Sequence, residues 1–85
     1  MQQTLITSEY EMSAFLQAFD ERYDDEKRVL SEAVVFLLAR SGRASRKAIL
    51  LYLIAELEGT QDVIRLNVLR SCLELVTRPA DYTDN

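Results

Sequence analysis

The sequence predicts an all-α fold: a small helical hairpin bundle of three to four helices that forms a dimer. In four segments, apolar residues recur at the i, i+3, i+4, i+7 spacing of one helical face, and no run alternates as a strand would. The 85 residues include only two Gly and one Pro, so helices joined by short loops are expected. Hydrophobic residues make up 48% of the chain, more than so small a monomer buries easily, which favours self-association.

The first helix is predicted over residues 8–21 and the second over residues 25–41. Ser8 and Glu11 have the spacing of a capping box, in which each side chain accepts a backbone N–H. Gly42 can adopt the left-handed conformation that ends the second helix. The apolar faces are Met12, Phe15, Leu16 and Phe19 in the first helix, and Val29, Leu30, Ala33, Val34, Leu37 and Leu38 in the second.

The third helix is predicted over residues 46–58 and the fourth over residues 61–78. Ser45 and Thr60 are the expected N-caps, and Pro79 forbids continuation of the fourth helix. The predicted hydrophobic core combines the apolar faces of the second and third helices. Its members are Leu30, Val34, Leu37, Ile49, Leu53, Ile54 and Leu57.

Several apolar side chains exceed what a single buried face explains. Val35 and Phe36 extend the face of the second helix, so we expect that helix to be buried on two sides, while Leu51 and Tyr52 lie off the stripe of the third. The fourth helix carries two apolar stripes, of which one is expected to face the core and the other a partner chain. The candidate dimer interface comprises Ile64, Leu66, Val68, Leu69, Leu73, Leu75 and Val76.

The chain is long enough for one domain. Residues 1–24 are expected to form an N-terminal segment with a short helix, residues 25–79 the helical domain, and residues 80–85 a disordered tail. No signal peptide is expected, because the start lacks a basic region and an apolar run. The longest apolar stretch, residues 33–39, is far below the roughly 20 residues of a membrane helix. These features predict a cytoplasmic protein.

The composition argues against catalysis and against a bound cofactor or metal. The chain has no His, which removes the usual general base and the commonest metal ligand. Its one cysteine, Cys72, cannot form a disulfide or a thiolate zinc site within the chain, and its place near an apolar stripe predicts a buried structural thiol. We therefore expect no enzyme, no cofactor and no small-molecule ligand.

Four cations form a basic junction between the second and third helices: Arg40, Arg43, Arg46 and Lys47. One interpretation is a contact for DNA or another anionic partner, supported by the free N–H groups at a helix start. The other is a solvated loop whose charge complements the preceding helix end. The formal net charge of −4 opposes strong nonspecific binding to nucleic acid.

Five acids form an acidic segment before and at the start of the second helix: Asp20, Glu21, Asp24, Asp25 and Glu26. The segment can be interpreted as a docking surface for a basic partner. It can also be a solvated loop followed by helix-starting charges, which stabilise the helix through its dipole.

The stretch from Glu26 to Val76 resembles a known family. It contains Leu-Ile-x-x-Leu-Glu at residues 53–58 and Leu-Arg-x-x-Leu-Glu-Leu-Val at residues 69–76, together with Val29-Leu30 and Gly42. This pattern resembles the enterobacterial YmgB/AriR family of biofilm and acid-resistance regulators, also called two-component-system connector proteins. The residues are mostly of the core type, so the resemblance bears on fold more than on function.

The resemblance implies an all-helical cytoplasmic homodimer, shaped like the Hha type of nucleoid-associated regulator. It implies a regulatory role in biofilm formation and stress, exerted through the response regulator of the Rcs phosphorelay, and it brings no catalytic residues. DNA binding without sequence readout is implied as an alternative. A third hypothesis is a structural or antitoxin-like dimer. The basic junction departs from the family pattern, where polar Asn and Asp are common.

Overall fold

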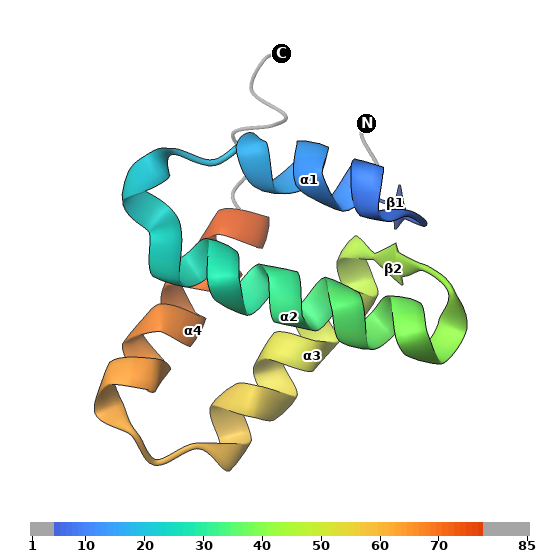
Figure 1. Cartoon of the computed structure of the whole chain (residues 1–85). Helices are drawn as coiled ribbons and strands as arrows, with labels where there is room; N and C mark the ends of the chain where they lie inside the picture. Colours follow the sequence, from blue (N-terminus) through green and yellow to red (C-terminus); the bar gives the residue numbers. More distant parts are fainter. Residues whose placement is uncertain (1–4, 78–85) are drawn as a thin grey trace.

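The computed structural model describes residues 5–77, and these form a mostly helical, compact structure (Figure 1). Four α-helices within this range confirm the predicted helical class. A short 3-10 turn and two very short strands complete it. In chain order the elements are β1 (Leu5–Ile6), α1 (Glu9–Gln17), η1 (Glu21–Tyr23), α2 (Asp24–Ser41), β2 (Ala44–Ser45), α3 (Arg46–Gly59) and α4 (Val63–Thr77).

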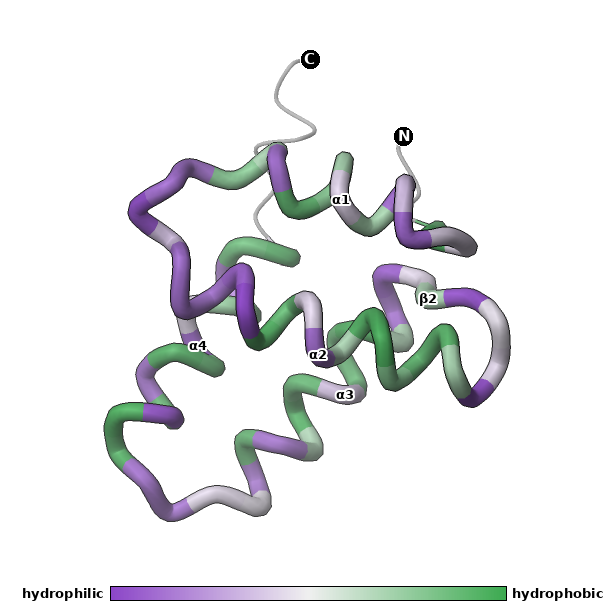
Figure 2. The backbone as a smooth tube through the Cα atoms, viewed as in Figure 1, coloured by the Kyte–Doolittle hydropathy of each residue, from purple (hydrophilic) through white to green (hydrophobic). Residues whose placement is uncertain are grey.

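Helix α2 is the centre of the structure. It contacts α1, α3 and α4, and α3 and α4 also pack against each other. In Figure 1, α1 lies along one side of α2 while α3 and α4 lie on the other. The tube in Figure 2 has hydrophobic stretches where α2, α3 and α4 meet. The largest fully buried side chains come from these three helices: Leu30, Val34, Ile49, Leu53, Leu69 and Cys72.

The helix-capping predictions are largely confirmed. The Ser8 hydroxyl accepts the Glu11 N–H at 3.2 Å, and the Ser45 hydroxyl accepts the Ala48 N–H at 3.1 Å. Gly42 ends α2 with φ of 80°, in the left-handed region that glycine adopts at low cost. Each of these residues fixes where a helix begins or ends.

Glu11 completes the first cap in a different way from the predicted capping box. Its Oε1 accepts the backbone N–H of Thr7 at 2.7 Å and the Thr7 hydroxyl at 2.8 Å. The Thr7 backbone hydrogen bond, followed by the hydroxyl, lowers the pKa of the Glu11 carboxyl. The carboxylate therefore links β1 to the first turn of α1.

Two predicted helix boundaries are wrong. Helix α1 ends at Gln17 instead of residue 21, because the Asp20 carboxylate accepts the Arg22 N–H at 2.9 Å and starts a separate turn. Helix α4 begins at Val63 instead of residue 61. Its capping side chain is Asp62, which accepts the Ile64 N–H at 3.0 Å, whereas the Thr60 hydroxyl accepts only the N–H of Asp62.

The two strands were not predicted. Leu5 pairs with Ser45 and Ile6 with Ala44, in antiparallel orientation. Strands of two residues are too short to show alternation in a sequence. The pairing brings Ile6, which is 2% exposed, into the core formed by the helices. The described part of the N-terminal segment therefore shares one core with the helical domain, while the predicted tail at 80–85 lies outside the described residues.

The predicted core is confirmed in its centre and wrong at one position. Leu30, Val34, Ile49 and Leu53 are fully buried. Leu37 and Leu57 are half-buried and pack against them. Ile54 is 40% exposed, because the face of α3 that meets the core is centred on Ile49 and Leu53 and leaves Ile54 outside it.

Shortening Leu53 should destabilise the fold strongly. Leu53→Ala removes a fully buried side chain and leaves a cavity, so we expect the free energy of unfolding in urea to fall by about 2–5 kcal/mol. Val63→Ala is the control, since Val63 is 66% exposed and its loss should change stability by less than about 0.5 kcal/mol. Equal effects of the two substitutions would contradict this description of the core.

Cys72 should react with thiol reagents only when the chain opens. The side chain is fully buried, and its Sγ donates to the Glu26 carbonyl oxygen at 3.5 Å. Burial raises the pKa of the Cys72 thiol to about 12, so the thiolate that would react is scarce. We expect a colorimetric disulfide reagent to label native protein at least about 100-fold more slowly than urea-unfolded protein.

The same thiol gives folding a pH dependence with a defined sign. An exposed thiol ionises near pH 8.5, whereas the buried one stays neutral until about 12. The unfolded state therefore releases its proton first, and Cys72 lowers the free energy of unfolding as pH rises from about 8.5 towards 12. Rapid labelling under native conditions would contradict both expectations.

Candidate functional site

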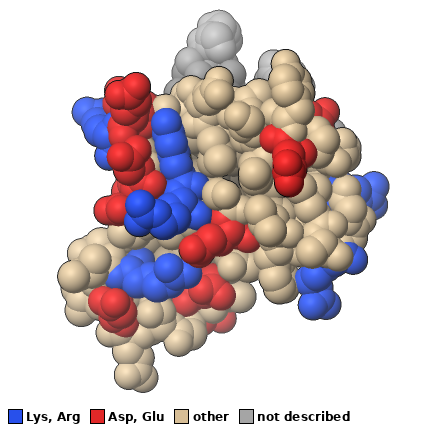
Figure 3. Space-filling model, viewed as in Figure 1, with Lys and Arg blue, Asp and Glu red and all other residues tan. Residues whose placement is uncertain are grey.

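The basic junction lies at one end of the molecule, where α2 gives way to β2 and α3. Arg40, Arg43 and Lys47 are exposed, and blue atoms appear in Figure 3 at the right edge, where Figure 1 places this loop. The Ser41 hydroxyl is within hydrogen-bonding distance of two carbonyl oxygens to which it can donate, those of Leu37 at 3.2 Å and Arg43 at 3.0 Å. The Arg40 guanidinium lies 5.3 Å from the centre of the Phe36 ring. These contacts hold the loop in one shape.

Arg46 differs from the other three cations of the basic junction. It is half-buried, and its Nε donates to the Val76 carbonyl oxygen at 2.9 Å. A cation at the last turn of a helix is favoured by the helix dipole. Arg46 therefore ties the start of α3 to the end of α4, a structural contact that the sequence did not reveal. The exposed positive charge of the junction comes from the other three residues.

The acidic segment is mixed with cations on the surface. Asp25 Oδ1 lies 3.6 Å from Arg28 Nη1, and about 70% of each side chain is exposed. The ion pair therefore contributes little to stability. Asp20 is engaged as the cap of η1, and Glu26 is half-buried. Figure 3 shows red and blue atoms side by side over the left part of the molecule. This arrangement does not present a uniform acidic face.

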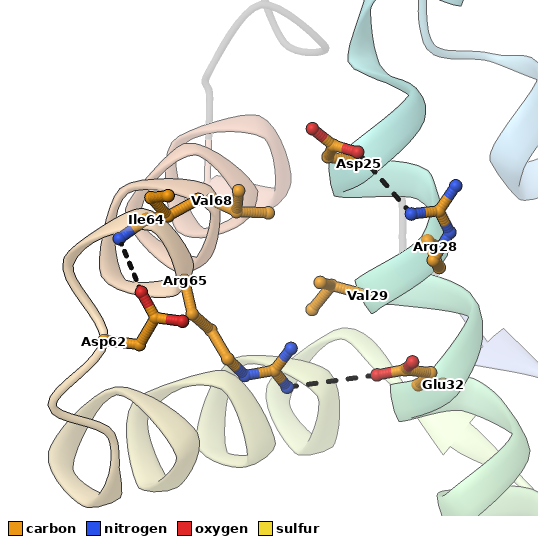
Figure 4. A pocket seen from close by; sticks show the side chains of 8 residues that line it. All are labelled: Asp25, Arg28, Val29, Glu32, Asp62, Ile64, Arg65 and Val68. Carbon is orange, nitrogen blue, oxygen red and sulfur yellow. Dashed lines mark hydrogen bonds and ion pairs between the residues drawn. The ribbon is translucent and has the colours of Figure 1, made fainter.

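A charged groove of about 280 Å³ lies between α2 and the start of α4 (Figure 4). Its floor is apolar and its rim carries both signs of charge. In Figure 4 the Arg65 side chain extends from α4 towards Glu32 on α2. The lining residues are Asp25, Arg28, Val29, Glu32, Asp62, Ile64, Arg65 and Val68.

Arg65 connects three helices at the edge of the charged groove. Its Nη2 donates to Glu56 Oε1 on α3 at 3.0 Å, and Glu32 Oε1 on α2 lies 3.9 Å away. The hydrogen bond to Glu56 raises the pKa of the Arg65 guanidinium. Nearby Tyr52 has its pKa raised, first by burial and then by the charges of Glu56 and Glu32. The network links α4 to α2 and α3 through partly exposed side chains.

A second, apolar groove of about 460 Å³ lies between α2 and α3. Leu51 is 57% exposed and Phe36 is 45% exposed on this side of the molecule, and the rings of Phe36 and Tyr52 are 5.3 Å apart. Helix α2 is packed between α1 and the α3–α4 pair, as predicted, but Val35 and Phe36, the residues expected to be buried by this, are exposed. The lining residues are Phe36, Leu37, Ala48, Leu51, Tyr52, Ala55 and Glu56.

The apolar groove is the surface that sequence reasoning did not single out. The sequence did contain a signal for it, because four apolar side chains lie outside the single buried face expected of each helix. These are Val35, Phe36, Leu51 and Tyr52. Their meeting at one place depends on how α2 packs on α3, which the periodicity of either helix alone does not give.

The seven residues of the candidate dimer interface fall into three groups. Leu69 and Val76 are buried within one chain, and Ile64 is 75% exposed at the charged groove. Leu66, Val68, Leu73 and Leu75 are half-buried.

Within residues 5–77, no group of three or more metal-ligating side chains comes together. None of the helices in this range combines the length and the hydrophobicity that a membrane span requires.

The chain matches one known protein family. The sequence profile described as "Biofilm development protein YmgB/AriR" matches residues 22–78, which include α2, α3 and α4. Regulatory protein AriR from Escherichia coli O1:K1 / APEC is 32% identical over 71 residues, covering 84% of this chain and 81% of the relative.

Other relatives carry the same name. Regulatory protein AriR of E. coli SMS-3-5 / SECEC is 33% identical over 67 residues, covering 79% of this chain and 76% of its own length. The protein of that name in E. coli K12 / DH10B is 31% identical, with the same coverage. No solved structure matches the chain.

The contact between Arg65 and Glu56 should give a small, salt-sensitive coupling energy. The two side chains are 35% and 39% exposed, so we expect a double-mutant cycle of Arg65→Gln and Glu56→Gln to give a coupling of about 0.5–1 kcal/mol. The value should fall when the salt is raised from about 0.05 to 1 M. Glu32→Gln should couple more weakly, because Glu32 lies 3.9 Å from Arg65.

Proposed function

Because the chain belongs to the YmgB/AriR family of biofilm development and regulatory proteins, we propose that it is a non-enzymatic cytoplasmic regulator acting by protein contact. Its partner is the response regulator of the Rcs phosphorelay, and its effect is on biofilm formation and acid or stress resistance. The match across α2, α3 and α4 carries this proposal, since these helices build nearly all of the core.

The surface of the chain suits a protein that acts by contact. Apolar side chains that remain exposed on a small domain favour binding to another protein. Leu51, Phe36 and Val35 are each between 45% and 57% exposed, beside three exposed cations of the basic junction. We propose that the chain works as a homodimer and that the exposed cations Arg40 and Arg43 meet acidic groups of the regulator.

The connector hypothesis is tested by mixing the protein with the purified response regulator at tens of micromolar and about 0.15 M salt. Size exclusion with light scattering should give a complex heavier than either component. An unrelated response regulator is the partner control. Failure to form a complex at these concentrations would overturn the hypothesis.

A pair of charge reversals locates the contact. Arg43→Glu should weaken the complex at least about 10-fold if the basic junction meets an acidic surface. Arg70→Glu changes the net charge equally at an exposed position on α4 and should leave affinity within about 2-fold. An equal loss for both variants would indicate general electrostatics instead of a defined contact.

DNA binding is the second candidate function, and the exposed cations of the basic junction are the observation that favours it. If Arg40, Arg43 and Lys47 of both chains in a dimer touched phosphates, the log–log slope of affinity against salt would be about −5. The net charge of −4 per chain opposes this mode. No shift of duplex DNA at about 0.05 M salt would exclude it.

A further inference from the structure

The outer face of α3 is an amphipathic stripe of its own. Lys47, Leu51, Ile54, Ala55 and Glu58 are all exposed, and their spacing places them along one side of the helix. Leu51 is 57% and Ile54 is 40% exposed. The stripe is apolar in the middle and charged at both ends, with a cation at the N-terminal end and an acid at the C-terminal end.

Helix α2 widens this apolar surface. The groove of about 460 Å³ between α2 and α3 is bordered by Phe36 of α2 and by Leu51 of α3. Val35, at the next position on α2, is 53% exposed. Leu51 borders both the stripe and the groove, whereas Val35 and Ile54 do not line the groove. The exposed stripe of α3 is therefore the surface that a helix from another chain can cover.

Two copies of the stripe are complementary when they run in opposite directions, because the cation at one end then meets the acid at the other. If α3 meets α3 of a second copy in antiparallel orientation about a two-fold axis, Leu51 can lie opposite the partner's Ile54. In the same register, Lys47 lies opposite the partner's Glu58. A two-fold interface repeats every contact, so two apolar pairs would be flanked by two ion pairs.

We propose that the outer face of α3, centred on Leu51 and Ile54, is the interface between two copies of this chain, paired through antiparallel α3 helices and closed at each end by Lys47 and Glu58. The assignment rests on the homodimer of the proposed function and adds to it the face and the register. Charge complementarity favours a second copy of this chain as the partner, because the same stripe supplies both members of each ion pair.

The alternative face on α4 has exposed apolar side chains only at the start of the helix, where Val63 and Ile64 lie beside charged residues. Leu69 and Val76 are already buried in the single chain. Ile64 is exposed but stands at the rim of the charged groove, near Asp62 and Arg65. The outer face of α3, by contrast, has no charged residue between Leu51 and Ile54, the two apolar side chains at its centre.

The register has a consequence for the basic junction. The 14 residues of α3 extend about 20 Å at 1.5 Å per residue. In an antiparallel pair, the two basic junctions would stand at opposite ends of the interface. An anionic partner would then meet either junction singly, or both only if it spans that separation.

A matched pair of apolar-to-acid substitutions tests the face. Leu51→Asp should convert the dimer to a monomer in size exclusion with light scattering, because it puts a charge at the centre of the interface. Ile64→Asp adds the same charge at a more exposed apolar position outside the face and should leave the dimer intact. Circular dichroism should give both variants the helical content of the wild type, since both side chains point to solvent in the single chain.

Charge reversal tests the register. Lys47→Glu should raise the dimer dissociation constant about 10-fold. The new carboxylate at position 47 would face Glu58 of the other copy, and this repulsion would occur at both ends of the interface. Glu58→Lys should act similarly, and the double variant Lys47→Glu/Glu58→Lys should recover to within about 3-fold of the wild type. Arg70→Glu is the control for net charge and should have no such effect.

The outcomes separate the proposed face from the proposed dimer. A wild type that remains monomeric at about 100 μM would overturn both. A dimer that survives Leu51→Asp but dissociates with Ile64→Asp would place the interface on α4 and overturn only the face. A dimer that loses stability with Lys47→Glu without recovery in the double variant would overturn the register.

Discussion

The fold depends on the burial of one side of α2 against α3 and α4. Leu30 and Val34 of α2 meet Leu53 of α3 and Leu69 of α4 in a core from which water is excluded. In a chain of 85 residues no second core can compensate for a defect here. The caps at Ser45 and Gly42, and the contact of Arg46 with the end of α4, act mainly by holding the helices where this burial is possible.

The same small size explains why apolar side chains remain outside. A small domain cannot enclose all the hydrophobic residues that its composition supplies. Part of the surplus lies where α2 packs on α3, around Phe36 and Leu51, and part lies at the start of α4, at Val63 and Ile64. The charged groove at Arg65 stands apart, and its rim carries one ion pair within α2 and one between α4 and α2. The two grooves therefore differ in character: the apolar one suits contact with a protein, and the charged one carries an ion pair that links α4 to α2.

The match to a family of regulatory proteins is consistent with this difference between the two grooves. The family match covers the helices that build the core, so it defines the scaffold, while the surface residues define what that scaffold contacts. Exposed Arg40, Arg43 and Lys47 lie beside the apolar groove at the end of α2 and the start of α3. A partner bound at this end would meet both positive charge and apolar surface.

Local sequence patterns were sufficient to predict the helical class, the centre of the core at Leu30, Val34, Ile49 and Leu53, and the caps at Ser8, Gly42 and Ser45. These depend on local periodicity and on hydrogen bonds within a few residues, which a sequence displays directly. Four features follow from the packing of the helices and could not be predicted. They are the pairing of Ile6 with Ala44, the exposure of Ile54, the contact of Arg46 with Val76, and the groove that Phe36 and Leu51 line together. Each of these joins or separates residues on different elements, and the packing angle that sets them depends on the whole core.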